Sequence, residues 1–429
     1  MRRAIAPAVL LSCAAFAFSQ TPGFPDLNVR QSAARAAVER AVRALEAGDA
    51  EGAREASDEA RYLDPGNSDA RYLLAAADLR GGRPTPEAEG ELRTALAGGT
   101  FLRYTADDAA RLLAHILVRT KRYSEALALA SRPGLAGDSD ALYLRVRALR
   151  FLGDPDAFLR AVDAGLDRFP SDARIPRELL AFAARTPRTE PTAARVGRVE
   201  ARLGYYRFLD PEILSLLAPF RTDPEARRDL ILEYRATGRR NPAATVRALD
   251  LGILDDAQAV TEFFGFPSLS WEDLRDLRGF LRGPEGRAAF ASAFSGYSGV
   301  LGSDPDGDGY FETRSTLRAG IVESWILDFD QDGRPELSLR FLDDLPGSGR
   351  MTLTGAETVF EYGEYPYLNR VLYRTSSGVR EYLFSPDALA FRRWSSSRDP
   401  GGVRGRGSRP GGRMRGFRPR RPAPPLPSG

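Results

Sequence analysis

The chain contains almost none of the side chains on which most enzymes depend. Its 429 residues include one histidine, His115, one lysine, Lys121, and one cysteine, Cys13. Nucleophilic triads need a placed imidazole, zinc sites need histidine or cysteine ligands, and the phosphate-binding patterns GxxxxGKS and GxxxxGKT do not occur. His115 lies in RLLAHILVR, which is typical of an ordinary helix. We therefore do not expect an enzyme; only chemistry by paired carboxylates, such as glycoside hydrolysis, stays open.

Apolar runs long enough to cross a membrane are also lacking. The longest, Ala4 to Phe18, has about 15 residues, whereas a helix needs roughly 20 to span a bilayer. Arg2 and Arg3 precede it, and it ends in Ala17-Phe18-Ser19, with small residues where a signal peptidase reads. We expect residues 1–19 to be a signal peptide and the mature chain, without a transmembrane helix, to be exported to the periplasm or beyond.

Cys13 permits a second interpretation of the N-terminus. The stretch Leu10-Leu11-Ser12-Cys13 resembles a bacterial lipobox, which would make Cys13 a lipidated N-terminus and anchor the protein to a membrane. The apolar run continues past Cys13, however, where lipoproteins turn polar. Cleavage after Ser19 would instead leave an exported protein with no thiol and no disulfide.

Positive charge is concentrated in the last residues of the chain. Residues 395–429 carry nine arginines against one acid, Asp399. Subtracting the +8 of this tail and the +2 of residues 1–19 from the net charge of +3 leaves about −7 for the rest. The tail has few core-forming residues, and we expect it to be disordered. It resembles RNA-binding arginine-glycine segments, but export argues against nucleic acid and favours anionic envelope polymers, lipid head groups or no partner.

From residue 33 to 186 the sequence predicts alanine-rich helices of about 12 to 16 residues. Four phrases place Asp and then Ala at an expected helix start: NSDARYLLAAA, TADDAARLLAHIL, GDSDALYLRVRAL and PSDARIPRELLAF. Their alanines, at 70, 109, 141 and 173, are separated by 39, 32 and 32 residues. These steps bracket the period of a helix-turn-helix repeat.

This region resembles a divergent tetratricopeptide repeat array over roughly 150 residues. The motif's small and proline positions match Ala41, Ala44, Ala53, Ala60 and Pro65 in the first unit and Leu144, Ala148, Ala157, Ala161, Ala164 and Pro170 in the third. The resemblance implies an α-solenoid whose groove binds a protein or peptide. A non-repetitive helical bundle is the alternative.

The remaining patterns complete an α+β, multidomain organisation. We expect a linker at 20–32, the repeat domain at 33–186, an irregular helical domain or degenerate repeats at 187–302, and a small antiparallel β-domain of five to seven strands at 303–394. Apolar residues at three- and four-residue spacing support the helices, as in PEILSLLAPF. Alternation in ELSLRFL supports the strands.

Two segments of the β-domain share the pattern D-x-D-x-D-G-x-x-E, from Asp304 to Glu312 and from Asp328 to Glu336. Alternate carboxylates in a tight loop converge their oxygens on one point, and the glycine permits the positive φ that folds the loop back. Hard oxygen donors in this number suit Ca²⁺. Two copies 24 residues apart are difficult to attribute to chance.

The loops resemble the short calcium loops of integrin-like, dockerin-like and thrombospondin-type repeats. The ligands that the resemblance implies are Asp304, Asp306, Asp308, Glu312 and the Tyr310 carbonyl in the first loop, and Asp328, Asp330, Asp332, Glu336 and the Arg334 carbonyl in the second. They depart from an EF-hand, because the acid falls at position nine and no helix pair flanks them. The alternative is a pair of Asp/Gly turns without metal, although clustered carboxylates repel one another.

Together these features predict an exported, non-enzymatic scaffold with a structural calcium ion. The helical array would bind a protein or peptide, and calcium would stabilise the β-domain without affecting the helices. The rival is an envelope carbohydrate- or polymer-binding protein that acts through aromatic residues of the β-domain, Trp325, Tyr362, Tyr365 and Tyr367. A carboxylate-only hydrolase is a third option, but among 58 acidic residues some pair always has a suitable spacing.

Overall fold

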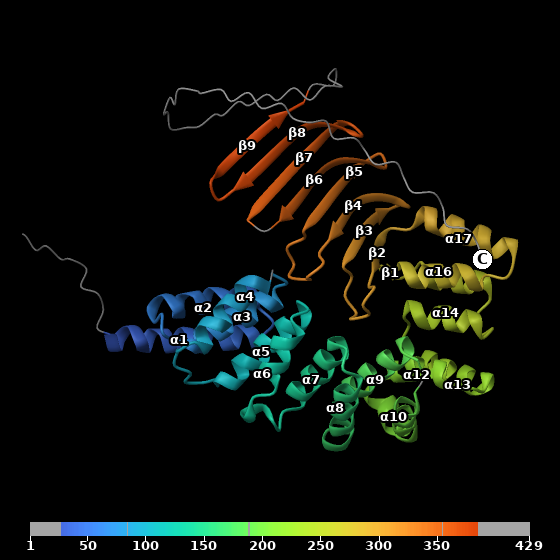
Figure 1. Cartoon of the computed structure of the whole chain (residues 1–429), viewed down its shortest axis with the longest axis horizontal. Coiled ribbons are helices and arrows are strands. Elements are labelled where there is room, and N and C mark those ends of the chain that lie inside the picture. Colours follow the sequence, from blue (N-terminus) through green and yellow to red (C-terminus); the bar gives the residue numbers. More distant parts are fainter. Residues whose placement is uncertain (1–26, 84, 188, 354, 385–429) are drawn as a thin grey trace, which may run out of the picture.

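The computed structural model describes residues 27–83, 85–187, 189–353 and 355–384. It shows an α+β protein in which a curved series of helices comes first and a single twisted sheet comes last (Figure 1). The predicted signal peptide with Cys13 and the predicted tail at 395–429 lie outside the described residues. None of the helices in the described ranges combines the length and apolar character that crossing a membrane requires.

The first nine helices form a stack of helix pairs. Each helix contacts the next one along the chain, and α7 contacts both α5 and α9. This pattern of neighbour contacts is the arrangement of a repeat array. Their bounds are α1 Leu27–Glu46, α2 Ala50–Leu63, α3 Ser68–Arg80, α4 Thr85–Leu96, α5 Ala106–Arg119, α6 Tyr123–Ala130, the 3₁₀ turn Pro133–Leu135, α7 Ser139–Leu152, α8 Pro155–Arg168 and α9 Arg174–Arg185. The first helix begins six residues before the expected start at 33 and takes up part of the expected linker.

Side-chain caps explain why the repeated phrases start helices. Asn67, Thr105 and Asp138 each accept a hydrogen bond from a backbone N–H of the first turn, at the starts of α3, α5 and α7. Such caps satisfy donors that have no partner within the helix. The alanines that follow, such as Ala70, are fully buried and let neighbouring helices approach closely. The fourth phrase starts α9 without a side-chain cap.

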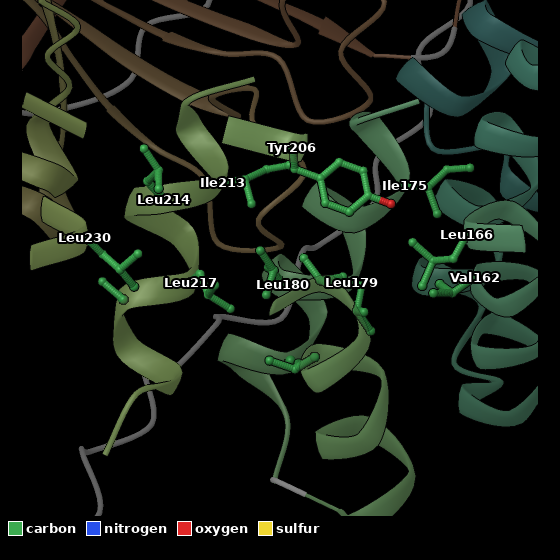
Figure 2. Packing of buried hydrophobic residues seen from close by; sticks show 14 of the residues in the cluster. Val162, Leu166, Ile175, Leu179, Leu180, Tyr206, Ile213, Leu214, Leu217 and Leu230 are labelled. Carbon is green, nitrogen blue, oxygen red and sulfur yellow. The ribbon is translucent and has the colours of Figure 1, made fainter. Parts of the chain in front are cut away.

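The helical stack continues past residue 187 without a break in its core. One apolar cluster runs from Leu142 in α7 to Ala248 in α14, and Figure 2 shows Leu179, Leu180, Tyr206 and Leu217 meeting within it. The later elements are α10 Glu190–Ala201, α11 Leu203–Leu209, α12 Glu212–Leu217, the 3₁₀ turn Ala218–Phe220, α13 Pro224–Ala236, α14 Pro242–Asp250, α15 Asp256–Phe263, α16 Trp271–Phe280 and α17 Pro284–Gly296. Five of these helices, α11, α12, α14, α15 and α16, have ten residues or fewer, whereas among the first nine helices only α6 does.

The sheet is larger than the five to seven strands expected, and it begins earlier than residue 303. Its nine strands lie in chain order, antiparallel except for the parallel pair β1 and β2. Their bounds are β1 Ser268–Ser270, β2 Gly299–Ser303, β3 Thr313–Arg318, β4 Ile321–Leu327, β5 Leu337–Leu342, β6 Leu345–Leu353, β7 Ala356–Glu364, β8 Tyr367–Thr375 and β9 Gly378–Leu383. A three-residue strand is too short to show alternation, so β1 is not recognisable in the sequence.

Helices cover only the first strands of the sheet. Leu269, Leu301 and Leu317 are buried in a core shared with helices α14 to α16. The strand register places Leu301 in one row with residues of β3 to β9. The apolar members of that row beyond β3, such as Trp325 and Phe360, are only half-buried. The sheet therefore depends on the helices at one end.

The two aspartate segments lie at the same end of the sheet. Residues 304–312 (loop 1) connect β2 to β3, and residues 328–336 (loop 2) connect β4 to β5. In an antiparallel meander, alternate connections fall at the same edge. Figure 1 shows both loops projecting from this end of the sheet toward the helices of the first half of the stack.

Candidate metal centre

The two loops fold in the same way. Each has a positive φ at its fourth and sixth positions: Gly307 and Gly309 in loop 1, and Gln331 and Gly333 in loop 2. A positive φ at the sixth position is what the predicted role of the glycine requires. Gln331 has a φ of 57°, in the left-handed region that side chains other than glycine rarely adopt.

Two bonds from backbone N–H groups to aspartates recur in both loops. In loop 1, Asp308 N donates to Asp306 Oδ1 at 3.0 Å and Tyr310 N to Asp308 Oδ1 at 2.8 Å. In loop 2, Asp332 N donates to Asp330 Oδ1 at 3.2 Å and Arg334 N to Asp332 Oδ1 at 2.6 Å. Tyr310 and Arg334, whose carbonyls the resemblance implies as ligands, therefore occupy equivalent places.

Loop 1 gathers all four of its predicted carboxylates. Ligand atoms of Asp304, Asp306, Asp308 and Glu312 lie within 4.8 Å of one another. Asp308 and Glu312 are only 5% and 3% exposed, and their Oδ2 and Oε2 atoms have no hydrogen-bond partner among the described residues. Burial raises the pKa of Asp304, Asp308 and Glu312 above the ordinary value.

Loop 2 gathers three of its four predicted carboxylates. Ligand atoms of Asp328, Asp330 and Asp332 lie within 4.8 Å of one another, whereas Glu336 Oε2 accepts the backbone N–H of Phe329 at 2.8 Å. Asp328 is buried, and its Oδ1 atom has no hydrogen-bond partner among the described residues. Burial raises the pKa of Asp328 and Asp332.

The chemistry of the residues in the two loops would suit a hard divalent cation. The bonds from backbone N–H groups to aspartates are those of Asp/Gly turns and would form without metal. A turn does not explain buried carboxylate oxygens without partners, Asp308 Oδ2, Glu312 Oε2 and Asp328 Oδ1, because such groups are costly unless bonded. A donor set made only of oxygens suits Ca²⁺ among the common metals.

Lys121 is a residue of this site that sequence reasoning missed. It lies in the turn between α5 and α6 with a φ of 59°. Its Nζ is 2.8 Å from Asp306 Oδ2 and also bonds Glu312 Oε1. Burial alone would lower the pKa of Lys121, but its bonds to Asp306 and Glu312 raise it. The available signal was its rarity: it is the only lysine in a chain with 61 basic residues, the rest arginine.

Arginines of the array hold the backbone of loop 1. Arg147 in α7 bonds the Asp308 carbonyl, and Arg150 donates to the Gly307 carbonyl at 2.9 Å. Both also donate to Glu178 in α9, at 2.8 and 2.7 Å. Burial alone would lower the pKa of Arg147, but the Glu178 carboxylate raises it. Loop 1 is thus fixed to α7 and α9 through a buried network.

Loop 2 contacts the array at the start of α4 through fewer groups. Thr85 N and Thr85 Oγ1 donate to the Asp332 carbonyl at 2.8 and 3.2 Å. Arg334 pairs with Glu87, and both side chains of this pair are about half exposed. The attachment of loop 2 to the helices is therefore more accessible to water than that of loop 1.

The loops also contact each other. Gln331 Nε2 in loop 2 donates to Glu312 Oε1 in loop 1 at 3.2 Å, and Asp328 N donates to the Glu312 carbonyl at 2.9 Å. The Lys121 ammonium lies 5.1 Å from the centre of the Phe329 ring. The loops and the α5–α6 turn consequently form one connected group of residues.

A cavity of about 280 Å³ adjoins loop 1 on the array. It is lined by His115, Val118, Arg119, Tyr143, Leu144 and Arg147 of the helices and by Asp308, Gly309 and Tyr310 of the loop. His115 Nε2 is 3.7 Å from Asp140 Oδ2. The nearby His115 imidazole and the hydrogen bond from Arg174 hold the pKa of Asp140 below its usual range. These lining residues offer positive charge and aromatic surface, and no serine, threonine or cysteine is among them.

Comparison with solved structures finds similarity at low sequence identity. No family model matches the chain, and no curated protein matches it. A tetratricopeptide repeat protein from Parabacteroides merdae has 13% identity, a TM-score of 0.43, and coverage of 61% of this chain and 98% of its own. Pseudomonas aeruginosa pilF has 16% identity, a TM-score of 0.33, and coverage of 59% and 90%. The P58(IPK) TPR domain has 12% identity, a TM-score of 0.21, and coverage of 61% and 97%.

Proposed function

We propose that the protein is a non-enzymatic scaffold whose helical array binds a protein or peptide next to loop 1. The observation that carries this proposal is the cavity of about 280 Å³ on α5 and α7. His115, Arg119 and Arg147 provide donors and positive charge there, and Tyr143 with Leu144 provides apolar surface. This combination suits a peptide segment that carries a carboxylate beside a large apolar side chain.

We propose further that Ca²⁺ braces the end of the sheet that faces the array. Asp304, Asp306, Asp308, Glu312 and the Tyr310 carbonyl would hold an ion in loop 1, and Asp328, Asp330, Asp332, Glu336 and the Arg334 carbonyl would hold one in loop 2. The buried carboxylate oxygens without partners support this role. The ion would be structural, since it would neutralise charge between elements that the loops connect.

Export remains part of the proposal and rests on residues 1–19. A periplasmic or extracellular location would supply the millimolar calcium at which weak loops of this kind become saturated. Lipid anchoring through Cys13 is the alternative location. The arginines of residues 395–429 would attract anionic envelope polymers or lipid head groups electrostatically.

A second candidate function, carbohydrate or polymer binding by the sheet, is supported by one specific observation. Tyr365 and Tyr367, at the connection of β7 to β8, are 45% and 59% exposed. The rings of Tyr362 and Tyr365 meet edge to face with centroids 5.3 Å apart. Exposed aromatic rings with a polar hydroxyl provide a surface on which sugar rings can stack.

Two matched variants separate these functions. Arg119→Glu reverses a charge of the cavity, and Tyr365→Ala with Tyr367→Ala removes the exposed rings of the sheet. Envelope proteins recovered by the wild-type chain and by the tyrosine variant, but lost with Arg119→Glu, would support the peptide scaffold. Retention of an envelope polysaccharide that is lost only with the tyrosine variant would support the sheet and contradict the scaffold.

A further inference from the structure

We propose that Lys121 is a built-in counter-cation of loop 1 that competes with calcium, so that calcium binding there loosens the hold of the array on the sheet. The inference rests on the proposed calcium sites and names their regulation. Lys121 belongs to the α5–α6 turn of the array, whereas loop 1 belongs to the sheet. The contact between them therefore joins the two halves of the molecule.

The Lys121 ammonium lies beside the carboxylates that would bind the ion in loop 1. It bridges Asp306 Oδ2 and Glu312 Oε1, two of the four carboxylates that gather in loop 1. The side chain of Glu312 is 4% exposed and that of Lys121 is 17% exposed, so little water screens them. Two cations that share the same carboxylates within a few ångströms repel strongly in such a place. Each must weaken the binding of the other.

The chemistry of lysine distinguishes this contact from the arginine contacts around it. Arg147 and Arg150 donate to backbone carbonyls of Asp308 and Gly307 and leave the carboxylates free. Within the part of the chain that the structure describes, Lys121 is the one array side chain that bonds a carboxylate of loop 1. An ammonium is a compact point charge, unlike the planar guanidinium. The single lysine of the chain thus places a compact positive charge on two carboxylates of loop 1.

Loop 2 has no comparable competitor among the described residues. Lys121 contacts it only through the face of the Phe329 ring. The nearest basic group to its aspartates, Arg314 of β3, is 3.9 Å from Asp328 Oδ2 and belongs to the sheet itself. We therefore infer that loop 2 binds calcium more tightly than loop 1, although it gathers fewer carboxylates.

Linkage gives the consequence for the array. If Lys121 lowers the calcium affinity of loop 1, calcium must lower the affinity of loop 1 for Lys121 by the same factor. The turn that carries Lys121 directly follows Val118 and Arg119, which line the cavity. Calcium in loop 1 would release this turn and make the cavity more accessible to a partner.

Calcium titration of the full chain tests the competition. Asp330→Ala serves as the background in all proteins, so that loop 1 alone is titrated. Adding Lys121→Gln should tighten calcium binding by about tenfold or more. Arg122→Gln is the matched control, because it removes the next positive charge along the chain, whose partners are Glu89 and Glu125 of the array and not carboxylates of loop 1; it should change the affinity by about twofold at most. Unchanged or weaker binding by a folded Lys121→Gln protein overturns the inference.

Hydrogen exchange on the wild-type chain gives a second readout that does not depend on a variant. The amides of Thr120, Lys121 and Arg122 bond to carbonyls at the end of α5, and calcium should speed their exchange. Slower exchange with calcium contradicts the inference. If neither the wild-type chain nor Lys121→Gln binds calcium, the calcium proposal itself fails and this inference with it. If the wild-type chain binds calcium but Lys121→Gln binds it no tighter, this inference alone fails.

Discussion

Loop 1 and loop 2 share a nine-residue pattern and a backbone conformation but not their surroundings. Loop 1 is held by a buried network that includes Arg147, Arg150 and Glu178. Lys121 also pairs with two of the carboxylates of loop 1. Loop 2 is held by Thr85 and by an exposed pair of Arg334 with Glu87. Glu336 remains outside the carboxylate group of loop 2, whereas Glu312 joins that of loop 1.

This difference shows that a local motif fixes the shape of a site but not its charge balance. The Asp and Gly positions give both loops the same turn, because those bonds are made within the loop itself. The cations around each loop come from distant segments of the chain. The two loops should therefore respond differently when their supports are removed, and the following predictions compare them.

The largest loss of stability is expected from Glu178→Ala, which removes the carboxylate that pairs with the two arginines bound to loop 1. Glu178 is 5% exposed and pairs with Arg147 and Arg150, so its removal leaves two largely buried guanidinium groups without their carboxylate. Breaking a buried pair by removing one partner costs about 3 to 5 kcal/mol. Urea unfolding of the full chain, followed by circular dichroism, measures the loss. A loss of less than about 1 kcal/mol would show that loop 1 is not supported by this network.

The next effect is that of calcium itself. Saturation at about 100 times the dissociation constant should stabilise the folded chain by roughly 2.7 kcal/mol per site, because the ion binds only the folded loops. Asp306→Ala should remove the loop 1 contribution and Asp330→Ala the loop 2 contribution. Isothermal titration and melting with and without a chelator provide the measurement. An absence of binding at millimolar calcium would leave both loops as ordinary turns.

The contacts between the loops and the helices change one expectation from the sequence. The sequence led us to expect that the helices would not respond to calcium. Because Thr85 and Arg150 join backbone carbonyls of the loops to α4 and α7, the helical signal should change together with that of the sheet. A chelator that shifts the melting of the sheet and leaves the helical signal unmoved would show that the contacts are energetically unimportant.

A smaller effect is expected from adding one methyl group to loop 1. Gly307 has a φ of 75°, and a Cβ there would meet the Arg185 guanidinium, whereas Gly309 has a φ of 92° and open space. The left-handed conformation alone costs about 1 to 2 kcal/mol for a residue with a Cβ. Gly309→Ala should show this cost, and Gly307→Ala should show it together with the lost bond from Arg185 to the Pro305 carbonyl. Thermal melts that rank the two variants in the opposite order would contradict the geometry.

The smallest loss of stability is expected when the exposed ion pair of loop 2 is removed. Glu87→Ala removes the exposed pair with Arg334, and exposed pairs contribute between 0 and about 1 kcal/mol. The loss should shrink further in about 1 M salt, because salt screens exposed charges. Urea unfolding at two salt concentrations measures it, with Glu178→Ala as the buried counterpart. Equal losses for the two glutamates would remove the distinction between the loops.

Much of the fold could be predicted from the sequence because its signals are local. Caps such as Asn67 and Thr105 act within one turn of a helix, and the alternation of ELSLRFL is that of strand β5. The boundaries were less predictable. The start of α1 at Leu27 and the short strand β1 carry no strong pattern, and the apolar core that crosses residue 187 depends on contacts between helices.

By itself, the sequence determined the order of helices and strands and the turn shape of both aspartate loops, because capping, alternation and Asp/Gly turn bonds act between residues a few positions apart. Only the tertiary structure decided which cations face those loops. Lys121 meets Glu312 across 191 residues, and Arg334 meets Glu87 across 247. The folded chain alone brings such pairs together, because no short-range pattern records how a sheet docks on a helical array.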